Sequence, residues 1–284
     1  MIRRILITGA NKGIGRAAVA AVLSAHDDTF VYLGARDRAR GEDAREALTA
    51  KQPSWAKRIE VVELDVSNAS SVTAASKRVE GLHAVVNNAG IGFADYDMRT
   101  VLDVNTRGPK RVCETFVPRI REGGRIVNVA SASGPMFVAK CSPERQRALT
   151  DPAITWEGIE AIMNECLAIE AKAGDFAAAG FGGGNAYGLS KACLNAYTML
   201  LAREHPALTI NSCTPGFIET DMTRPMTNGK TPTEMGMKPP AEGTRAIVHL
   251  LFGEVGTGWY YGSDAQRSPL DRYRAPGDPP YGGE

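Results

Sequence analysis

The chain has 284 residues, 43% of them hydrophobic, and a formal net charge of +1, which suits one large or two small α/β domains with a sizeable core. The near-neutral charge does not favour a nucleic-acid or anionic-membrane surface. Five scattered cysteines without a CxxC pair argue against a disulfide framework, and four histidines without ligand spacing predict no metal site. We expect a cytoplasmic protein, because an apolar segment follows the first four residues directly and no apolar run reaches the length of a membrane span.

Short apolar segments alternate with longer amphipathic segments, which is the pattern of a doubly wound parallel sheet. About seven strands are predicted, at residues 5–7, 30–33, 59–64, 83–86, 125–129, 208–211 and 258–261. The predicted helices cover residues 13–25, 38–50, 69–79, 98–121, 156–172, a stretch that begins near 185, and 241–252. Pro109 and Pro118 are expected to disturb the fourth of these helices, since proline lacks an amide hydrogen. We therefore predict a single Rossmann-type α/β domain over residues 1–284.

Two segments break this alternation. Residues from about 134 to 184 form a long insertion, which carries the helix at 156–172 and ends in Gly180-Phe181-Gly182-Gly183-Gly184. The tail from about 263 to 284 is rich in proline and glycine, and we expect it to be irregular.

A glycine-rich loop follows the first strand and opens the first helix, in Thr8-Gly9-Ala10-Asn11-Lys12-Gly13-Ile14-Gly15. Gly9 permits a tight turn, and Gly13 and Gly15 let the backbone approach a pyrophosphate at the helix N-terminus. The loop therefore predicts nucleotide binding; the alternative is a glycine-rich turn without a ligand.

Tyr187 and Lys191 lie one helical turn apart in Tyr187-Gly188-Leu189-Ser190-Lys191. A phenol ordinarily ionises near pH 10, too high for acid–base work at neutrality. An ammonium about 6 Å away would stabilise the phenolate by roughly 3 kcal/mol, or about two pKa units. The pair predicts a tuned general acid, although tyrosine–lysine pairs also occur by chance on solvated helix faces.

Several motifs occur together in one order along residues 2–262. They are T-G-x-x-x-G-x-G, Asp65 after the third strand, Asn87-Asn88-Ala89-Gly90, Asn105, Ser131, Tyr187-x-x-x-Lys191 and Pro215-Gly216. This set resembles the classical short-chain dehydrogenase/reductase family.

The resemblance implies a role for each matching residue. Tyr187 would be the general acid that protonates the developing alkoxide, and Lys191 would lower its pKa and bind the nicotinamide ribose. Ser131 would donate a hydrogen bond to the carbonyl oxygen, where negative charge develops. Asn105 would hold a water in a proton relay behind Lys191. Taken singly, Ser131 could instead cap local backbone, and Asn105 could instead bend a helix.

The segment after the second strand predicts the cofactor. Arg36 matches the family's NADP-selecting arginine, and Lys12 adds a second cation, so the pair favours the 2′-phosphate of NADPH. The alternative is that Asp37 turns inward and Arg36 is only solvated. The remaining residues expected at the cofactor are Gly9, Asn11, Gly13, Ile14, Gly15, Asp65, Val66, Asn87, Ala89, Gly90, Tyr187, Lys191, Pro215, Gly216, Ile218 and Thr220.

The insertion makes the resemblance more specific, to one branch of the family. Ser131 and Tyr187 are 56 positions apart, a wider spacing than in most of the family, and it resembles that of the monomeric carbonyl reductase branch. The inserted helix would cover the surface through which relatives associate, so we expect a monomer. A purely structural insertion is the alternative, but we expect the segment 180–184 to rim the pocket.

The candidate pocket walls are apolar: Phe93, Met136, Phe137, Phe181 and Phe217. The alternative for each aromatic is packing in the core. We therefore expect an NADPH-dependent carbonyl reductase that acts on an uncharged ketone, aldehyde or quinone, with no nucleic-acid or membrane partner. A narrow biosynthetic ketoreductase or alcohol dehydrogenase is one alternative, and a non-catalytic NADP-sensing regulator is another.

Overall fold

Eight strands form one sheet in the order β3-β2-β1-β4-β5-β6-β7-β8 in the computed structural model, whose described residues are 2–92 and 96–283. The strands are β1 (Arg3–Ile7), β2 (Thr29–Ala35), β3 (Ile59–Glu63), β4 (Leu82–Asn87), β5 (Ile120–Val129), β6 (Thr209–Cys213), β7 (Tyr260–Tyr261) and β8 (Arg267–Ser268). The first seven pair in parallel, and only the β7–β8 pair is antiparallel. The Rossmann-type sheet predicted from the sequence is confirmed.

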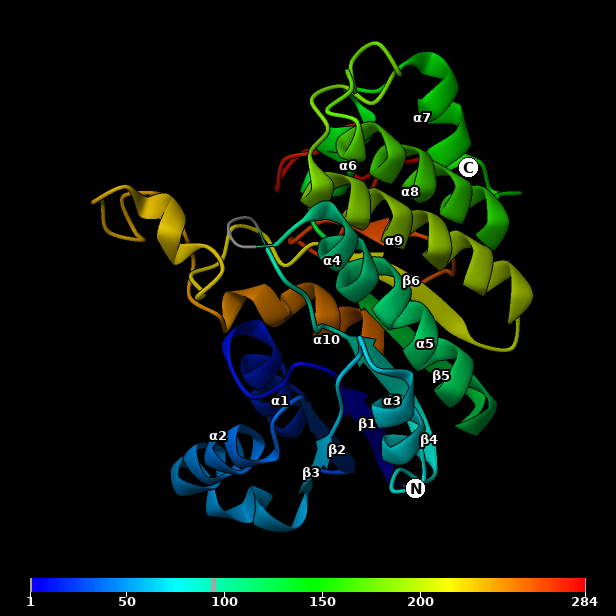
Figure 1. Ribbon diagram of the computed structural model, residues 1–284. Coiled ribbons are helices and arrows are strands. Elements are labelled where there is room, and N and C mark those ends of the chain that lie inside the picture. The colour runs from blue at the N-terminus through cyan, green and yellow to red at the C-terminus, as the bar shows by residue number, and fades with distance from the viewer. Residues whose placement is uncertain (1, 93–95, 284) are drawn as a thin grey trace.

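Helices cover both faces of the sheet (Figure 1). The helices are α1 (Gly13–Ala25), α2 (Arg38–Lys51), α3 (Ala69–Ser76), α4 (Met98–Leu102), α5 (Gly108–Phe116), α6 (Ser133–Val138), α7 (Pro143–Thr150), α8 (Trp156–Ala171), α9 (Ala186–Glu204) and α10 (Arg245–Phe252). Apolar side chains of α1, α2 and α10 form one core with the sheet, while those of α3, α5 and α9 belong to two cores on the other face. The chain therefore winds both ways from β1, and the edge where β1 and β4 end is the place where ligands bind in such sheets.

The helix predicted over 98–121 is broken into pieces. A π-helical turn at Asp103–Arg107 separates α4 from α5, a 3₁₀ turn follows at Val117–Arg119, and β5 already begins at Ile120. Pro109 occupies the first turn of α5, where a missing amide costs nothing, whereas Pro118 lies where the regular helix has ended. The extended pairing of Ile120 with Leu82 explains why the helix stops short of residue 121.

The insertion is more helical than the sequence predicts. The expected helix at 156–172 is confirmed as α8, but α6 and α7 were not predicted. Ile159, Met163 and Cys166 of α8 are fully buried in the core cluster that also contains Leu194 and Leu201 of α9. The insertion therefore packs over the outer side of α9.

The tail was expected to be irregular, and this expectation is partly wrong. Residues 267–268 add the strand β8, and the nearly buried Arg274 pairs with Asp264. The same guanidinium donates to the hydroxyl of Ser268, and the amide of Gly277 donates to Asp264 at 3.1 Å. One buried charged pair can organise a segment whose composition alone suggests disorder.

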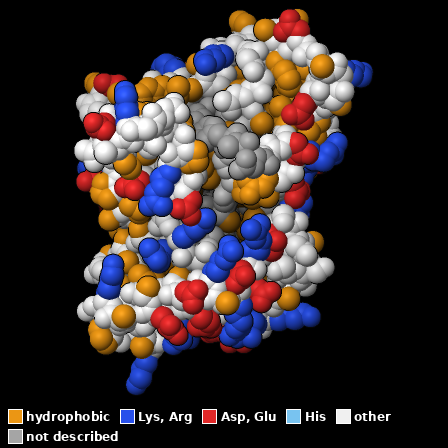
Figure 2. Space-filling model, turned by 60° about the vertical axis from the view of Figure 1, so that its left-hand side comes forward, with side chains coloured by type: hydrophobic (Ala, Val, Ile, Leu, Met, Phe, Trp, Pro, Cys, Tyr) orange, Lys and Arg blue, Asp and Glu red, His pale blue; other side chains and the backbone are white. Residues whose placement is uncertain are grey.

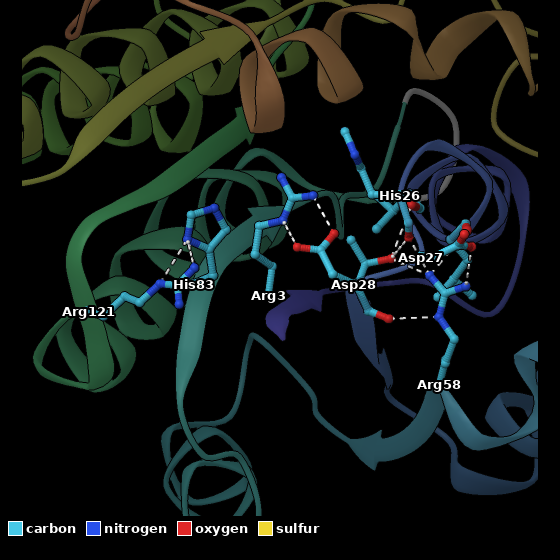
Figure 3. Close-up of polar contacts among 10 residues, drawn as sticks. Arg3, His26, Asp27, Asp28, Arg58, His83 and Arg121 are labelled. Carbon is cyan, nitrogen blue, oxygen red and sulfur yellow. Dashed lines mark hydrogen bonds and ion pairs between the residues drawn. The ribbon is translucent and has the colours of Figure 1, made fainter. Parts of the chain in front are cut away.

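At the opposite edge of the sheet, arginines surround a buried histidine (Figure 3). Arg121 donates from Nε to Nδ1 of His83 at 3.2 Å, and Arg3 pairs with Asp28 close by. Burial first, and then the neighbouring arginines, lower the pKa of His83 to about 4.

This histidine predicts acid sensitivity. As the pH falls from about 6.5 to about 4, His83 takes up a proton in the unfolded chain but stays neutral in the folded protein. The free energy of unfolding therefore drops by about 3 kcal/mol. His83→Asn keeps an acceptor for Arg121 and cannot titrate. Denaturant unfolding at several pH values should show wild type losing more stability than the variant over this range, whereas parallel curves would contradict the assignment.

Candidate active site

The glycine loop lies at the carboxyl ends of β1 and β4. Gly9 and Gly13 have φ angles of +61° and +53°, which side-chain-bearing residues rarely adopt. A Cβ on Gly15 would lie 2.3 Å from the carbonyl oxygen of Gly9 and 2.5 Å from Nδ2 of Asn88. The three glycines are therefore required by the turn and by close backbone contact. The tight turn at Gly9 was predicted, whereas the approach of Gly13 and Gly15 to a pyrophosphate stays a prediction.

The loop fits a dinucleotide pyrophosphate. Lys12 occupies the N-cap of α1, but its side chain does not cap the helix. The first amides of a helix lack internal partners and carry the positive end of the helix dipole, so they suit an anion. A cofactor at this edge would be held by Gly9, Asn11, Gly13, Ile14 and Gly15.

Two residues that sequence reasoning missed hold this loop. Nδ2 of Asn88 donates to the carbonyls of Thr8 and Gly9 at 2.9 and 3.2 Å, and the hydroxyl of Thr8 accepts from the amides of Asn88 and Ala89 at 3.0 Å each. The motif Asn87-Asn88-Ala89-Gly90 was recognised, but its second asparagine was given no role. The signal available in the sequence for this role was a polar side chain, Asn88, between two glycine-rich turns, the glycine loop and the turn at Gly90.

Tyr187 and Ser131 meet where α9 begins. The side chain of Asn185 caps the helix by accepting from the amide of Gly188 at 2.8 Å, which fixes the first turn that carries Tyr187. The side chain of Ser131, from the loop after β5, lies beside the phenol and acts to lower its pKa. The structure thus brings together the predicted acid and the predicted oxyanion donor.

The direction of the pKa shift at Tyr187 differs from the sequence-based expectation. Burial raises the pKa of the phenol above its ordinary value, and the side chain of Ser131 only partly opposes it. The Coulomb argument assumed a solvated pair, whereas here the loss of water around the phenol dominates. A tyrosine that stays protonated at neutral pH is in the correct state to donate a proton.

Lys191 lies beneath this pair. Its side chain is 4% exposed, and its ammonium lies 5.6 Å from the centre of the Tyr187 ring and donates to the carbonyl of Val129 at 3.0 Å. Burial lowers the pKa of Lys191 to about 8. The ammonium therefore remains mostly charged at neutral pH and lies close to the phenol.

Asn105 sits in the π-helical turn and is fully buried. Its amide exchanges two hydrogen bonds of 2.9 Å with the backbone of Ile91, and Nδ2 also donates to the hydroxyl of Ser190 at 3.1 Å. A Cβ on Gly90 would lie 3.2 Å from Oδ1 of Asn105 and 3.6 Å from Nζ of Lys191. Asn105 thus anchors the loop after β4 to α9, and Gly90 leaves room between it and Lys191.

The predicted cofactor residues occupy different environments around this edge. Arg36 is exposed at the end of β2, and Val66 is buried after β3. The carboxylate of Asp65 accepts from the amide and the hydroxyl of Ser67 at 2.9 and 2.7 Å. The side chain of Asn87 instead faces the interior, donating to Asn128 at 2.9 Å, so only the backbone of Asn87 can face a cofactor.

The segment 215–224, called the strap below, lies against the glycine loop. Ile218 is buried, and the methyl group of Thr220 lies 3.4 Å from the position of a Cβ on Gly13. Gly216 has a φ angle of +92°, which lets the chain turn after Pro215. The strap therefore lies against the glycine loop, and the cofactor contacts predicted for Pro215, Gly216, Ile218 and Thr220 stay a prediction.

The expected pocket walls are only partly available. Met136 and Phe217 are 46% and 37% exposed and can contact a substrate. Phe137 and Phe181 are buried in the core, and Arg145 lies 4.4 Å over the ring of Phe181, so the segment 180–184 does not present this aromatic to solvent. Phe93 lies outside the described residues. The prediction that Phe137 and Phe181 form the pocket wall is therefore wrong, because both rings are packed in the hydrophobic core.

Within residues 2–92 and 96–283, no helix has both the length and the apolar character needed to cross a bilayer.

A doubly wound sheet with Ser131, Tyr187 and Lys191 at its carboxyl edge defines a Rossmann-type oxidoreductase. Residues 3–143 match the family described as short chain dehydrogenase. The chain is 32% identical to carbonyl reductase [NADPH] 1 of Rattus norvegicus over 94% of this chain and 96% of that protein, and 30% identical to (+)-neomenthol dehydrogenase of Arabidopsis thaliana over 78% and 84%. The chain belongs to the short-chain dehydrogenase/reductase family and is similar to its carbonyl reductases.

Solved structures agree with this assignment. Salutaridine reductase from Papaver somniferum superposes with a TM-score of 0.76 at 26% identity, covering 91% of this chain and 99% of that one. An NADPH-bound carbonyl reductase from chicken fatty liver has a TM-score of 0.66 at 22% identity, covering 94% and 98%, and shows the same fold.

Proposed function

We propose that the chain is an NADPH-dependent carbonyl reductase that reduces a ketone, aldehyde or quinone, with Tyr187 as the general acid. The observation that carries the proposal is the constellation of Tyr187, Ser131 and Lys191 beside a glycine loop suited to a dinucleotide. The similarity to carbonyl reductase [NADPH] 1 supports both the cofactor and the class of reaction.

The residues divide the work of a carbonyl reduction. NADPH, when bound, supplies the hydride. The hydroxyl of Ser131 donates a hydrogen bond to the carbonyl oxygen, where negative charge develops as the carbon is reduced. Tyr187 gives its proton to that oxygen, and the charged Lys191 stabilises the resulting phenolate. Because Asn105 and Lys191 both border Gly90, we assign the return of the proton to this side of the site.

The cations Arg36 and Lys12 support the choice of NADPH over NADH. Arg36 is exposed where β2 ends, and the backbone of the glycine loop lies beside that strand end, since the amide of Ala10 donates to the carbonyl of Gly34 at 2.8 Å. A guanidinium and an ammonium in this position suit a 2′-phosphate dianion.

The intact catalytic set argues against a purely cofactor-sensing protein. A sensor has no need of a buried lysine and a serine beside one phenol. The exposed apolar side chains Met136 and Phe217 favour an uncharged substrate. A panel of carbonyl compounds separates a broad reductase from a narrow biosynthetic one.

Direct hydride transfer tests this function. With NADPH that carries deuterium at both C4 positions of the nicotinamide and a reducible ketone, we expect one deuterium on the carbinol carbon of the product, detected by mass spectrometry. Unlabelled alcohol, or no alcohol from any ketone, aldehyde or quinone, would refute the proposed reaction.

We also propose that the protein is a monomer. The inserted α8 covers part of α9, with Trp156 edge-on to Tyr197 at 5.8 Å, and Glu160 of α8 also pairs with Arg107 of the π-helical turn at 3.5 Å. Gel filtration with light scattering should give a mass near 30.3 kDa. A mass of twice this value would contradict the proposal.

A further inference from the structure

One ion pair at the edge of the nucleotide site has no role in the reaction described above. The ammonium of Lys12 lies 2.7 Å from the carboxylate of Asp221, 209 positions away along the chain. Both side chains are more than half exposed, at 62% and 58%. Lys12 holds the pKa of Asp221 below its usual value. The pair joins the glycine loop to the strap.

Packing on both sides fixes the aspartate end of this pair. Thr220 lies beside Gly13, and Met222 packs so closely on Gly92 that a Cβ there would lie 2.3 Å from its Cγ. Figure 1 shows the longer loop between β6 and α10 projecting from the body of the molecule beyond this point. The long, exposed side chain of Lys12 is therefore the partner that can turn away.

Lys12 also borders the position proposed for the 2′-phosphate. The loop backbone is hydrogen-bonded to the end of β2 between Ala10 and Gly34, and Lys12 and Arg36 each follow two residues later. Figure 2 shows Lys and Arg side chains on this face interspersed with Asp and Glu side chains. One ammonium thus has two anionic partners of similar chemistry within reach, a carboxylate of the protein and a phosphate of the cofactor.

We propose that Asp221 is a specificity-determining residue that competes with the 2′-phosphate of NADPH for Lys12. The inference rests on the proposed assignment of Lys12 to that phosphate. Binding of NADPH must break the ion pair, whereas NADH, which has no 2′-phosphate, leaves it intact. Asp221 therefore reduces the preference for NADPH that Arg36 and Lys12 create.

The neighbouring charges make this exchange easy. Arg224 lies 3.3 Å from the other carboxylate oxygen of Asp221, so the aspartate keeps a cation when Lys12 leaves. An exposed ion pair contributes little net stability, and its loss changes an affinity by no more than about fivefold.

The test measures dissociation constants for NADPH and NADH by calorimetry with wild type, Asp221→Asn, Lys12→Met and the double variant. Asp221→Asn should bind NADPH about two- to fivefold more tightly and NADH as wild type does. In the Lys12→Met background the Asp221→Asn change should have no effect on either cofactor. Glu219→Gln is the matched control, because Glu219 pairs with Arg224 at 3.3 Å and not with Lys12; it should leave both constants unchanged.

Each other outcome overturns a defined part of the account. If Lys12→Met binds NADPH with the affinity of wild type, the assignment of Lys12 to the 2′-phosphate is wrong. The proposed competition between Asp221 and that phosphate is then wrong as well. If Lys12→Met weakens NADPH binding but Asp221→Asn does not strengthen it, Lys12 does contact the phosphate and only the proposed competition is wrong. If Asp221→Asn weakens the binding of both cofactors equally, the Lys12–Asp221 ion pair helps to retain the cofactor, and the proposed competition is wrong.

Discussion

Replacing Tyr187 with phenylalanine should lower kcat for carbonyl reduction by about 100- to 10,000-fold, the range that a positioned general acid contributes. The substitution removes only the hydroxyl, which lies beside Ser131. The affinity for NADPH should change little, because the ring and the position of Lys191 remain. Steady-state kinetics and an NADPH titration measure the two effects separately.

Tyr197→Phe is the matched control for this experiment. Tyr197 lies on the same helix and is buried, with Cys113 beside its hydroxyl. The control should keep its kcat and lose only some stability. Equal turnover by Tyr187→Phe and wild type would show that another group protonates the product.

Replacing Arg36 with alanine should weaken NADPH binding by about 10- to 100-fold, the range expected for one charge-assisted contact to a phosphate. NADH binding should stay within about twofold of wild type, since NADH offers no phosphate to this guanidinium. Dissociation constants for both cofactors measure the change.

Arg78→Ala removes another exposed guanidinium, which pairs with Glu60 of β3. It should leave both constants unchanged, which separates a local contact from a general loss of positive charge. An equal loss of NADPH and NADH affinity in Arg36→Ala would contradict the assignment of Arg36 to the 2′-phosphate.

The sequence predicts the fold well because hydrophobic periodicity and the conformational freedom of glycine depend mainly on neighbouring residues in the chain. The predicted helix over 13–25 coincides with α1, and all seven predicted strands are confirmed. The Tyr187–Lys191 spacing places both residues on α9, and the position of Ser131 after β5 brings it to the same edge.

Other features depend on contacts between distant residues, which a single sequence does not reveal. The strand at 267–268 forms because the tail folds back on β7, and Arg274 finds Asp264 only in the folded chain. Phe181 follows a glycine and looks like a loop aromatic, yet the helices of the insertion bury it completely. The pKa of Tyr187 was misjudged for the same reason, since burial cannot be read from helical spacing.

The central claim is tested most directly by measuring kcat/KM for a panel of ketones, aldehydes and quinones with NADPH and, in parallel, with NADH. The account predicts reduction of carbonyl compounds with a clear preference for NADPH, and turnover of several members of the panel would identify a broad reductase. Tight NADPH binding with no reduction of any member, or equal rates with both cofactors, would contradict it.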